Sequence, residues 1–262
     1  MRRWGLILVL LVAASLLLSG CQTTTSSTRS DDEAGSLGVR ADASPADLYV
    51  ELSLAYLQEG DVATALQKVK YGLDKDERNA RAHGVIAIIY ERLGESQLAN
   101  RHFVDATTLD PQDPYIRNAY GNFLYGQGAY PAAVEQFELA LRNPLYSTPE
   151  VALTNAAVCF RLQGDMSQAE TYLRRALDRN RKYPMALGQM ALVSYERGNQ
   201  LSARAYLQRY LAVVDPSPDM LWLGVRIERA LGDGQAEREY AQLLRRKFPD
   251  SLEVQKLQES MN

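Results

Sequence analysis

Six glycine residues recur along the chain at an almost constant interval. They are Gly60, Gly94, Gly128, Gly164, Gly198 and Gly232. Successive members lie 34, 34, 36, 34 and 34 residues apart. A period of this length, kept over most of a 262-residue chain, indicates that one small unit is repeated six times. The period constrains the fold strongly, because each repeated unit packs mainly on its neighbours.

The residues around each glycine also repeat. Small residues stand five positions after five of the glycines: Ala65, Ala99, Ala133, Ala169 and Ala203. Large apolar residues stand four positions before the first four: Tyr56, Tyr90, Leu124 and Phe160. This pattern resembles the tetratricopeptide repeat (TPR), a 34-residue helix-turn-helix unit. The resemblance implies an all-α fold, an α-solenoid wound as a right-handed superhelix of six TPR units, with the first helix of each pair lining the concave wall.

The period also divides the chain. The predicted segments are a lipoprotein signal peptide at 1–20, a lipidated N-terminus and flexible tether at 21–45, six repeats within 46–250 and a capping helix at 251–262. The repeats are expected at about 46–79, 80–113, 114–148, 149–183, 184–217 and 218–250.

Several local features accompany this division. Ser194 stands where the fifth repeat should carry its aromatic residue, and Glu237 takes the small position of the sixth. Two extra residues fall between the third and fourth repeats, so the loop over 143–149 should bulge. Aspartates directly follow three turn glycines and can cap the second helices: Asp61, Asp165 and Asp233.

The N-terminal residues predict the subcellular location of the protein. A short basic start precedes an apolar run of 15 residues at 4–18, which suits a signal peptide better than a helix that crosses a bilayer core of about 30 Å. The next residues, Leu-Ser-Gly-Cys at 18–21, resemble a bacterial lipobox, which implies acylation of Cys21. The residue after Cys21 is Gln22 and not Asp. By resemblance to the sorting of Gram-negative lipoproteins, this favours anchoring in the outer membrane, with the protein facing the periplasm. The alternative is a generic signal peptide with an incidental cysteine.

Composition argues against several classes of function. Lys and Arg number 29 against 32 Asp and Glu, so the chain lacks the basic excess usual for nucleic-acid binding. Two Cys and two His are too few for an ordinary structural zinc site or a disulfide framework. No hydrolase, zinc-protease or phosphate-loop motif occurs. His83 and His102 are interpreted singly as packing or surface residues, and Cys159 as a buried core residue. We therefore expect no enzyme, no metal, no cofactor and no small-molecule substrate.

A protein partner is expected on the concave wall. By resemblance, the first helices place these candidate partner-binding residues there: Val50, Leu54, Leu57, Ile88, Glu91, Asn118, Asn122, Tyr125, Thr154, Asn155, Arg161, Leu192, Tyr195 and Trp222. The same positions include Gly84, Val158, Leu162, Gly188, Arg226 and Arg229. The wall mixes apolar, aromatic and polar groups. It is most apolar in the first repeat, at Val50, Leu54 and Leu57, and the alternative for these three is packing of the solenoid's own end.

Two asparagines on this wall partly resemble a peptide clamp. Asn122 with Asn155 resembles the pair that hydrogen-bonds the peptide backbone in carboxylate-clamp TPR domains. The basic members of such a clamp are missing, because Met185 and Gln189 stand in their places. A hydrophobic, extended or helical partner segment is therefore favoured over a C-terminal acidic tail.

The lipobox, the polar tether and the six repeats together resemble the type IV pilus biogenesis lipoproteins, pilotins of the PilF/PilW kind. The resemblance implies a non-enzymatic factor that binds the pilus secretin through its solenoid. It also implies that acylated Cys21, inserted in outer-membrane lipid, promotes the localisation and multimerisation of the secretin there. The alternative is a TPR lipoprotein that scaffolds another envelope complex, such as peptidoglycan hydrolases or the outer-membrane assembly machinery.

Overall fold

The computed structural model describes residues 44–260, which form thirteen α-helices and no strand. The predicted signal peptide and the predicted tether up to residue 43, including Cys21, lie outside these residues. The last two residues of the predicted tether belong to the first helix instead, because Ser44 caps it and Pro45 begins it. Within the described part, no helix combines the length and apolar character needed to cross a membrane.

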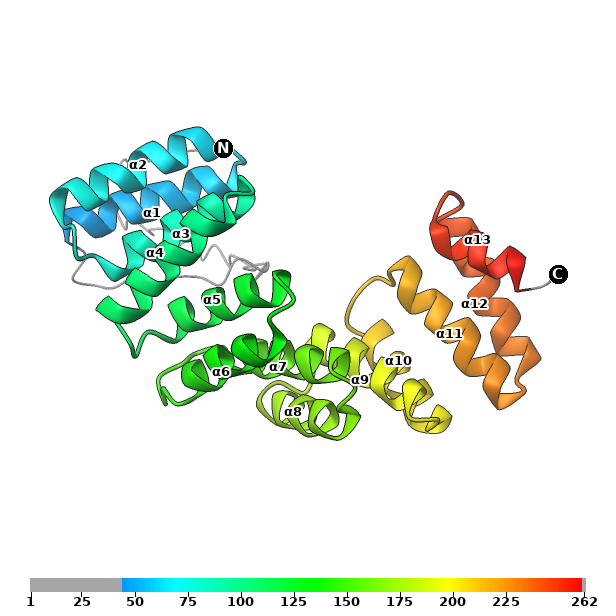
Figure 1. Ribbon diagram of the computed structural model, residues 1–262. Helices are drawn as coiled ribbons and strands as arrows, with labels where there is room; N and C mark the ends of the chain where they lie inside the picture. Colours follow the sequence, from blue (N-terminus) through cyan, green and yellow to red (C-terminus); the bar gives the residue numbers. More distant parts are fainter. Residues whose placement is uncertain (1–43, 261–262) are drawn as a thin grey trace, which may run out of the picture. The chain divides into compact units, whose positions relative to one another are not determined.

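The helices follow one another in pairs (Figure 1). The first six are α1 (Pro45–Gln58), α2 (Val62–Lys75), α3 (Ala80–Arg92), α4 (Ser96–Leu109), α5 (Pro114–Gly126) and α6 (Tyr130–Leu141). The next six are α7 (Pro149–Leu162), α8 (Met166–Arg179), α9 (Pro184–Glu196), α10 (Gln200–Leu211), α11 (Pro218–Leu231) and α12 (Gly234–Lys247). The last, α13 (Leu252–Glu259), is the helix predicted after the repeats.

The pairs stack in sequence order. Each odd-numbered helix from α1 to α11 packs against the even-numbered helix that follows it. Each odd-numbered helix also contacts the next odd-numbered helix, from α1 with α3 to α11 with α13. The predicted all-α TPR solenoid is therefore confirmed. The sense of its superhelical winding stays a prediction.

The turn glycines adopt a backbone conformation that few other residues tolerate. All six have φ between +74° and +84°, the left-handed region in which a Cβ is unfavourable. The predicted caps are confirmed: Asp61, Asp165 and Asp233 each accept a hydrogen bond from the backbone N–H three residues later. Each glycine therefore ends the first helix, and in these three repeats the aspartate begins the second.

The close approach of paired helices follows from small side chains. The alanines five residues after the first five turn glycines are completely buried. Larger residues fill the remaining space of the core, among them Phe103 and Phe137, which are also completely buried. Gly121 of α5 lies directly against the ring of Phe137 in α6, where even a methyl group would be too close.

The loop with two extra residues is anchored by a tyrosine. Tyr146 is buried against the core, and its ring meets that of Tyr115 edge-on with centroids 5.3 Å apart. Burial raises the pKa of the Tyr146 phenol. The neighbouring Leu145 is 86% exposed. The insertion therefore exposes the Leu145 side chain to solvent, while the buried Tyr146 side chain holds the loop in place.

An ion pair in which the carboxylate is buried joins the fifth repeat to the sixth. Arg204 of α10 donates from Nε to Oε1 of Glu228 in α11 over 3.0 Å, and a second bond runs from its Nη2 to Oε2. The same Nη2 lies 3.3 Å from Asp233, which caps α12. Glu228 is 2% exposed and stands four residues before Gly232, the position that is aromatic in repeats one, two and four.

The expectation that Cys159 is a core residue is confirmed. Its side chain is completely buried in α7. Burial raises the pKa of the Cys159 thiol to about 11. A thiol that is buried and protonated at neutral pH is a poor nucleophile.

Candidate interaction surface on the first helices

Apart from Asn155 and Leu162, the candidate wall residues fall into three rows along the odd-numbered helices. The rows stand ten, six and three residues before each turn glycine. Spacings of three and four residues place side chains on the same side of a helix. Each row thus contains one residue from every repeat. The exposure of the residues in a row decides whether that row can contact a partner.

In the row ten residues before the glycine, the members from the first five repeats are buried, which corrects the prediction that they face a partner. Val50, Asn118 and Thr154 are at most 3% exposed, and the glycines of the row, Gly84 and Gly188, are also buried. The next first helix covers this row: a methyl group on Gly84 would lie 3.5 Å from Cγ1 of Ile116. Trp222, in the last repeat, keeps part of its surface exposed.

Leu57 also departs from the prediction. It belongs to the row three residues before the glycine but is 4% exposed and packs in the core of the first two repeats. The carbonyl of Leu57 accepts a hydrogen bond from Arg92 of α3 over 3.0 Å. The apolar wall predicted from Val50, Leu54 and Leu57 is therefore mostly internal packing.

The other two rows remain accessible. The row six residues before the glycine is half-buried or exposed throughout: Leu54, Ile88, Asn122, Val158, Leu192 and Arg226. The row three residues before it is accessible at Glu91, Tyr125, Arg161, Tyr195 and Arg229. We call these residues, together with Asn155, the first-helix surface. It runs through all six repeats and mixes apolar, amide and charged groups.

Contacts between neighbouring repeats orient the polar members of this surface. The Asn155 side chain donates to Oδ1 of Asn122 over 2.8 Å. Arg161 bonds Glu196 of α9 at 3.3 Å. The Arg226 guanidinium lies 4.4 Å from the centre of the Tyr195 ring. These interactions hold the side chains in place before any partner arrives, which reduces the entropy lost on binding.

The arrangement matches a peptide clamp only in its amides. Asn118, Asn122 and Asn155 form one hydrogen-bonded group, in which Asn155 also donates to Asn118 over 3.4 Å. Met185, at the position of the clamp's basic residue, is 45% exposed but carries no charge. The group can bond a peptide backbone but offers no cation for a carboxylate at that position.

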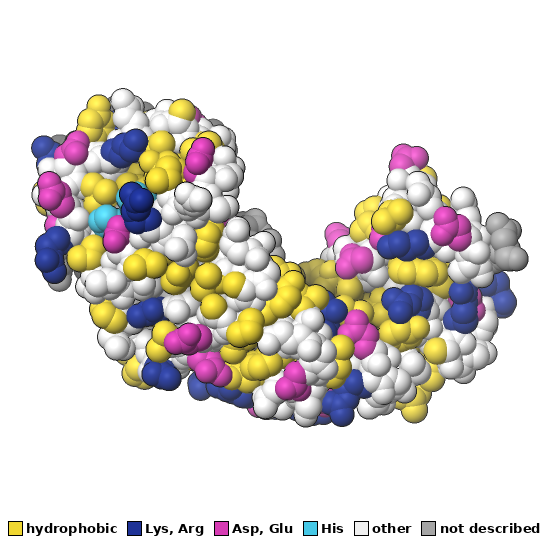
Figure 2. Space-filling view, viewed as in Figure 1, with side chains coloured by type: hydrophobic (Ala, Val, Ile, Leu, Met, Phe, Trp, Pro, Cys, Tyr) yellow, Lys and Arg dark blue, Asp and Glu magenta, His cyan; other side chains and the backbone are white. Residues whose placement is uncertain are grey.

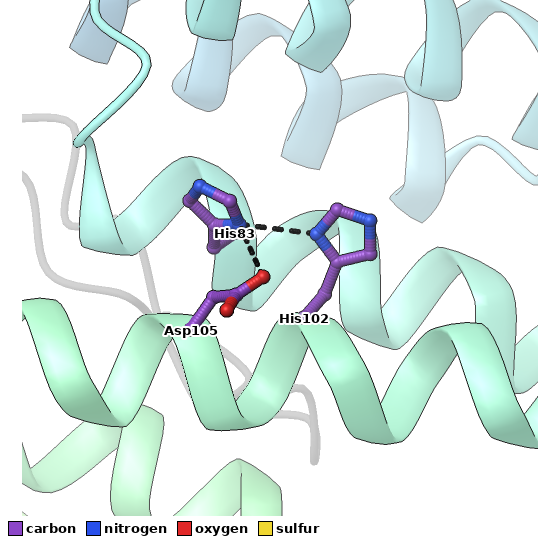
Figure 3. A group of neighbouring side chains, drawn as sticks. All are labelled: His83, His102 and Asp105. Atoms are coloured by element: carbon purple, nitrogen blue, oxygen red, sulfur yellow. Dashed lines mark hydrogen bonds and ion pairs between the residues drawn. The ribbon is translucent and has the colours of Figure 1, made fainter.

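The structure also brings together three polar residues from the two helices of the second repeat. His83 of α3 and His102 and Asp105 of α4 point toward one another (Figure 3). The two Nδ1 atoms are 3.0 Å apart. Burial, followed by the charge of His83, lowers the pKa of His102. The two histidines, interpreted singly from the sequence, thus contact each other across the helix pair.

A signal for this juxtaposition was present in the repeat. Antiparallel helices pair residues at fixed distances on either side of the turn. His83 lies 11 residues before Gly94 and His102 lies eight after it. In the next repeat, the residues at the same positions are Arg117 and Gln136, and they also bond, over 2.7 Å.

Comparison with known proteins places this fold in a family. The family model described as tetratricopeptide repeat matches residues 85–147, and a second with the same description matches residues 152–183. The type IV pilus assembly protein PilF of Pseudomonas aeruginosa is 28% identical over 212 residues, which are 81% of this chain and 84% of that protein. The crystal structure of PilW, described as a widely conserved type IV pilus biogenesis factor, is 32% identical with a TM-score of 0.76 and covers 82% of this chain and 99% of its own.

The chain belongs to the PilF/PilW family of type IV pilus biogenesis proteins.

The solved structure of Pseudomonas aeruginosa PilF agrees with this assignment: it is 28% identical, has a TM-score of 0.76 and covers 82% of this chain and 97% of its own. Beyond the family, the similarity is limited to the fold. The structure of the Cut9–Hcn1 hetero-tetramer of the anaphase-promoting complex is 15% identical, has a TM-score of 0.64 and covers 78% of this chain and 40% of its own. TPR domains bind protein partners, and membership of the PilF/PilW family connects this chain with the pilus machinery.

Proposed function

We propose that this protein is a lipid-anchored pilotin of the outer membrane. Its solenoid binds the secretin of the type IV pilus, and its acylated Cys21 brings the secretin to the outer membrane, where it multimerises. The observation that carries the proposal is the first-helix surface, an accessible set of apolar, amide and charged side chains in a chain of the PilF/PilW family. The protein acts as a binding and delivery factor and not as an enzyme.

The chemistry of the surface suits an apolar segment of a protein partner. Leu54, Ile88, Val158 and Leu192 supply one aliphatic group in each of four repeats. Their spacing along the stack fits side chains that project at intervals from an extended or helical segment. Asn122 is exposed beside them, and its amide can bond the partner's backbone. Apolar contacts then supply affinity while the amides fix the register.

Binding should depend on Tyr125 at the middle of this surface. Tyrosines are frequent hot spots at interfaces, where their loss costs more than about 1–2 kcal/mol, or roughly tenfold in affinity. Tyr125→Asp is therefore expected to weaken binding of the purified secretin by at least about tenfold, measured by surface plasmon resonance with the full chain. Tyr71→Asp is the matched control, because Tyr71 of α2 has nearly the same exposure, 43% against 40%, but lies on a second helix. Equal affinities for the two variants would contradict the proposed surface.

Delivery should depend on Cys21. In a Cys21→Ala strain the protein is expected to leave the outer-membrane fraction, and the secretin should remain monomeric on semi-native gels, with twitching motility lost. The Tyr71→Asp strain is the control and should retain all three properties. Normal secretin multimers in a clean deletion strain would refute the pilotin role. Co-purification of peptidoglycan hydrolases or outer-membrane assembly factors instead of the secretin would favour the alternative scaffold function.

A further inference from the structure

The second repeat carries a group of metal-ligand atoms apart from the first-helix surface. The Nδ1 atoms of His83 and His102 are 3.0 Å apart, and Oδ2 of Asp105 is 3.7 Å from Nδ1 of His83. One ligand atom from each of the three side chains lies within 4.8 Å of the others. His102 and Asp105 stand three residues apart on α4, so both project from one side of that helix toward α3 (Figure 3).

The backbone fixes the tautomer of His83. Its Nε2 lies 3.1 Å from the carbonyl oxygen of Glu77. A carbonyl oxygen can only accept a hydrogen bond, so Nε2 carries the proton and Nδ1 presents its lone pair to His102. Histidines that ligate metals almost always donate their second ring N–H in this way, which orients the ring and raises its basicity as a ligand. His83 is therefore held in the form that a metal ion requires.

The distances suit a small tetrahedral ion. Zn²⁺ binds imidazole nitrogens at about 2.0–2.1 Å, which at the tetrahedral angle separates two ligand nitrogens by about 3.3 Å. The observed separation of 3.0 Å needs only a slight opening of the pair. His83 is 13% exposed and Asp105 is 46% exposed, so the group is anchored on one side and open to a water ligand on the other. Three protein ligands with an open fourth position form a known type of zinc coordination.

We propose that His83, His102 and Asp105 bind one divalent first-row transition-metal ion, with Zn²⁺ as the representative ion. Without the ion, His102 donates its Nδ1–H to Nδ1 of His83. When the ion binds, this proton is exchanged through water to Nε2 of the same ring, and both Nδ1 lone pairs coordinate the metal. No proton is released overall. Asp105 supplies one negative charge, and the ion fastens α3 to α4.

The surrounding charges affect the affinity. Lys70 and Arg101 lie near His102, and their positive charges oppose the binding of a cation. Figure 2 shows histidine surface (cyan) with basic (blue) and acidic (magenta) side chains beside it. Neutral imidazoles prefer Zn²⁺, Cu²⁺ or Ni²⁺, whereas Mg²⁺ prefers carboxylate, carbonyl and water oxygens. Because the site offers two imidazoles and one carboxylate, we expect it to bind transition-metal ions in preference to Mg²⁺. The proposal does not depend on the pilotin function.

The test is calorimetric titration of the full chain, purified in detergent and treated with chelator, with ZnCl₂ at neutral pH. The expected result is one Zn²⁺ bound per chain and no binding of Mg²⁺. His83→Gln and His102→Gln should each weaken Zn²⁺ binding by at least about tenfold, since even outer-shell changes cost 10–100-fold. Asp105→Asn should weaken it less, and Asp74→Asn, which removes an exposed carboxylate from α2, should not change it.

A second measurement separates loss of the site from loss of the fold. Zn²⁺ is expected to raise the thermal midpoint of the wild-type chain, because an ion that binds only the folded state stabilises it. The His83→Gln/His102→Gln variant should unfold as a helical protein with a midpoint that Zn²⁺ does not change. This variant keeps both cysteines, so binding through thiols would persist in it. Equal Zn²⁺ binding by the wild type and the double variant, or equal binding of Mg²⁺ and Zn²⁺, would overturn the proposal.

Discussion

Replacement of Phe103 with alanine is expected to destabilise the protein by about 3–5 kcal/mol. Phe103 of α4 is completely buried. Its ring packs against two rings of α5, with centroids 5.2 Å from Tyr120 and 5.4 Å from Phe123. The substitution removes apolar surface and the aromatic contacts and leaves a cavity between the second and third repeats. Urea unfolding followed by circular dichroism measures the change in the free energy of unfolding.

The neighbouring residue provides the control. Val104 follows Phe103 on the same helix and is 45% exposed, so Val104→Ala should change the free energy by less than about 0.5 kcal/mol. Because repeats contact mainly their neighbours, Phe103→Ala can also separate the unfolding of the first two repeats from that of the rest. Similar losses for the two variants would show that the second and third repeats are not held together by this cluster.

Gly121→Ala is expected to destabilise the protein by about 1–3 kcal/mol, although alanine is the better helix former. A methyl group on Gly121 would lie 2.5 Å from Cε1 and 2.7 Å from Cδ1 of Phe137. The Phe137 ring is completely buried and cannot move aside without disturbing its other neighbours. The strain therefore outweighs the gain in helix propensity. The measurement is again the free energy of unfolding in urea.

Gly84→Ala is the matched control for this effect. Gly84 also lies within a first helix, but a methyl group there would meet Cγ1 of Ile116 at 3.5 Å, an ordinary van der Waals distance. Without a clash, the substitution should leave stability unchanged or raise it by up to about 1 kcal/mol. A destabilised Gly84→Ala protein, or a stable Gly121→Ala protein, would contradict the packing described for these helices.

Much of the fold was predictable because residues close together in the sequence determine the structure of each repeat. The turn glycines need a positive φ, and the alanines five residues later need a close helix contact. Asp61 and its equivalents cap the second helices where the sequence placed them. Each of these features depends on residues within a few positions of one another. A pattern of that kind can be recognised before any tertiary contact is known.

The exposure of the wall residues could not be predicted in the same way. Helical spacing places Val50, Leu54 and Leu57 on one side of α1 but does not say how deeply the next first helix covers that side. The covering depends on packing between repeats, which buried Val50 and Leu57 and left Leu54 half-exposed. The histidine pair was missed because each residue was judged against its own helix instead of against the position across the turn.

The ion pair between Arg204 and Glu228 has a consequence for the order in which repeats assemble. Similar units can in principle stack in the wrong order or exchange between chains. At the position of Arg204, six residues after the turn glycine, the first four repeats carry Leu66, Asn100, Val134 and Glu170. Against any of these, the buried Glu228 carboxylate would have no cation, a severe penalty in a desolvated site. The sixth repeat is thus matched to the fifth, and one charge pair helps to specify a single arrangement of the chain.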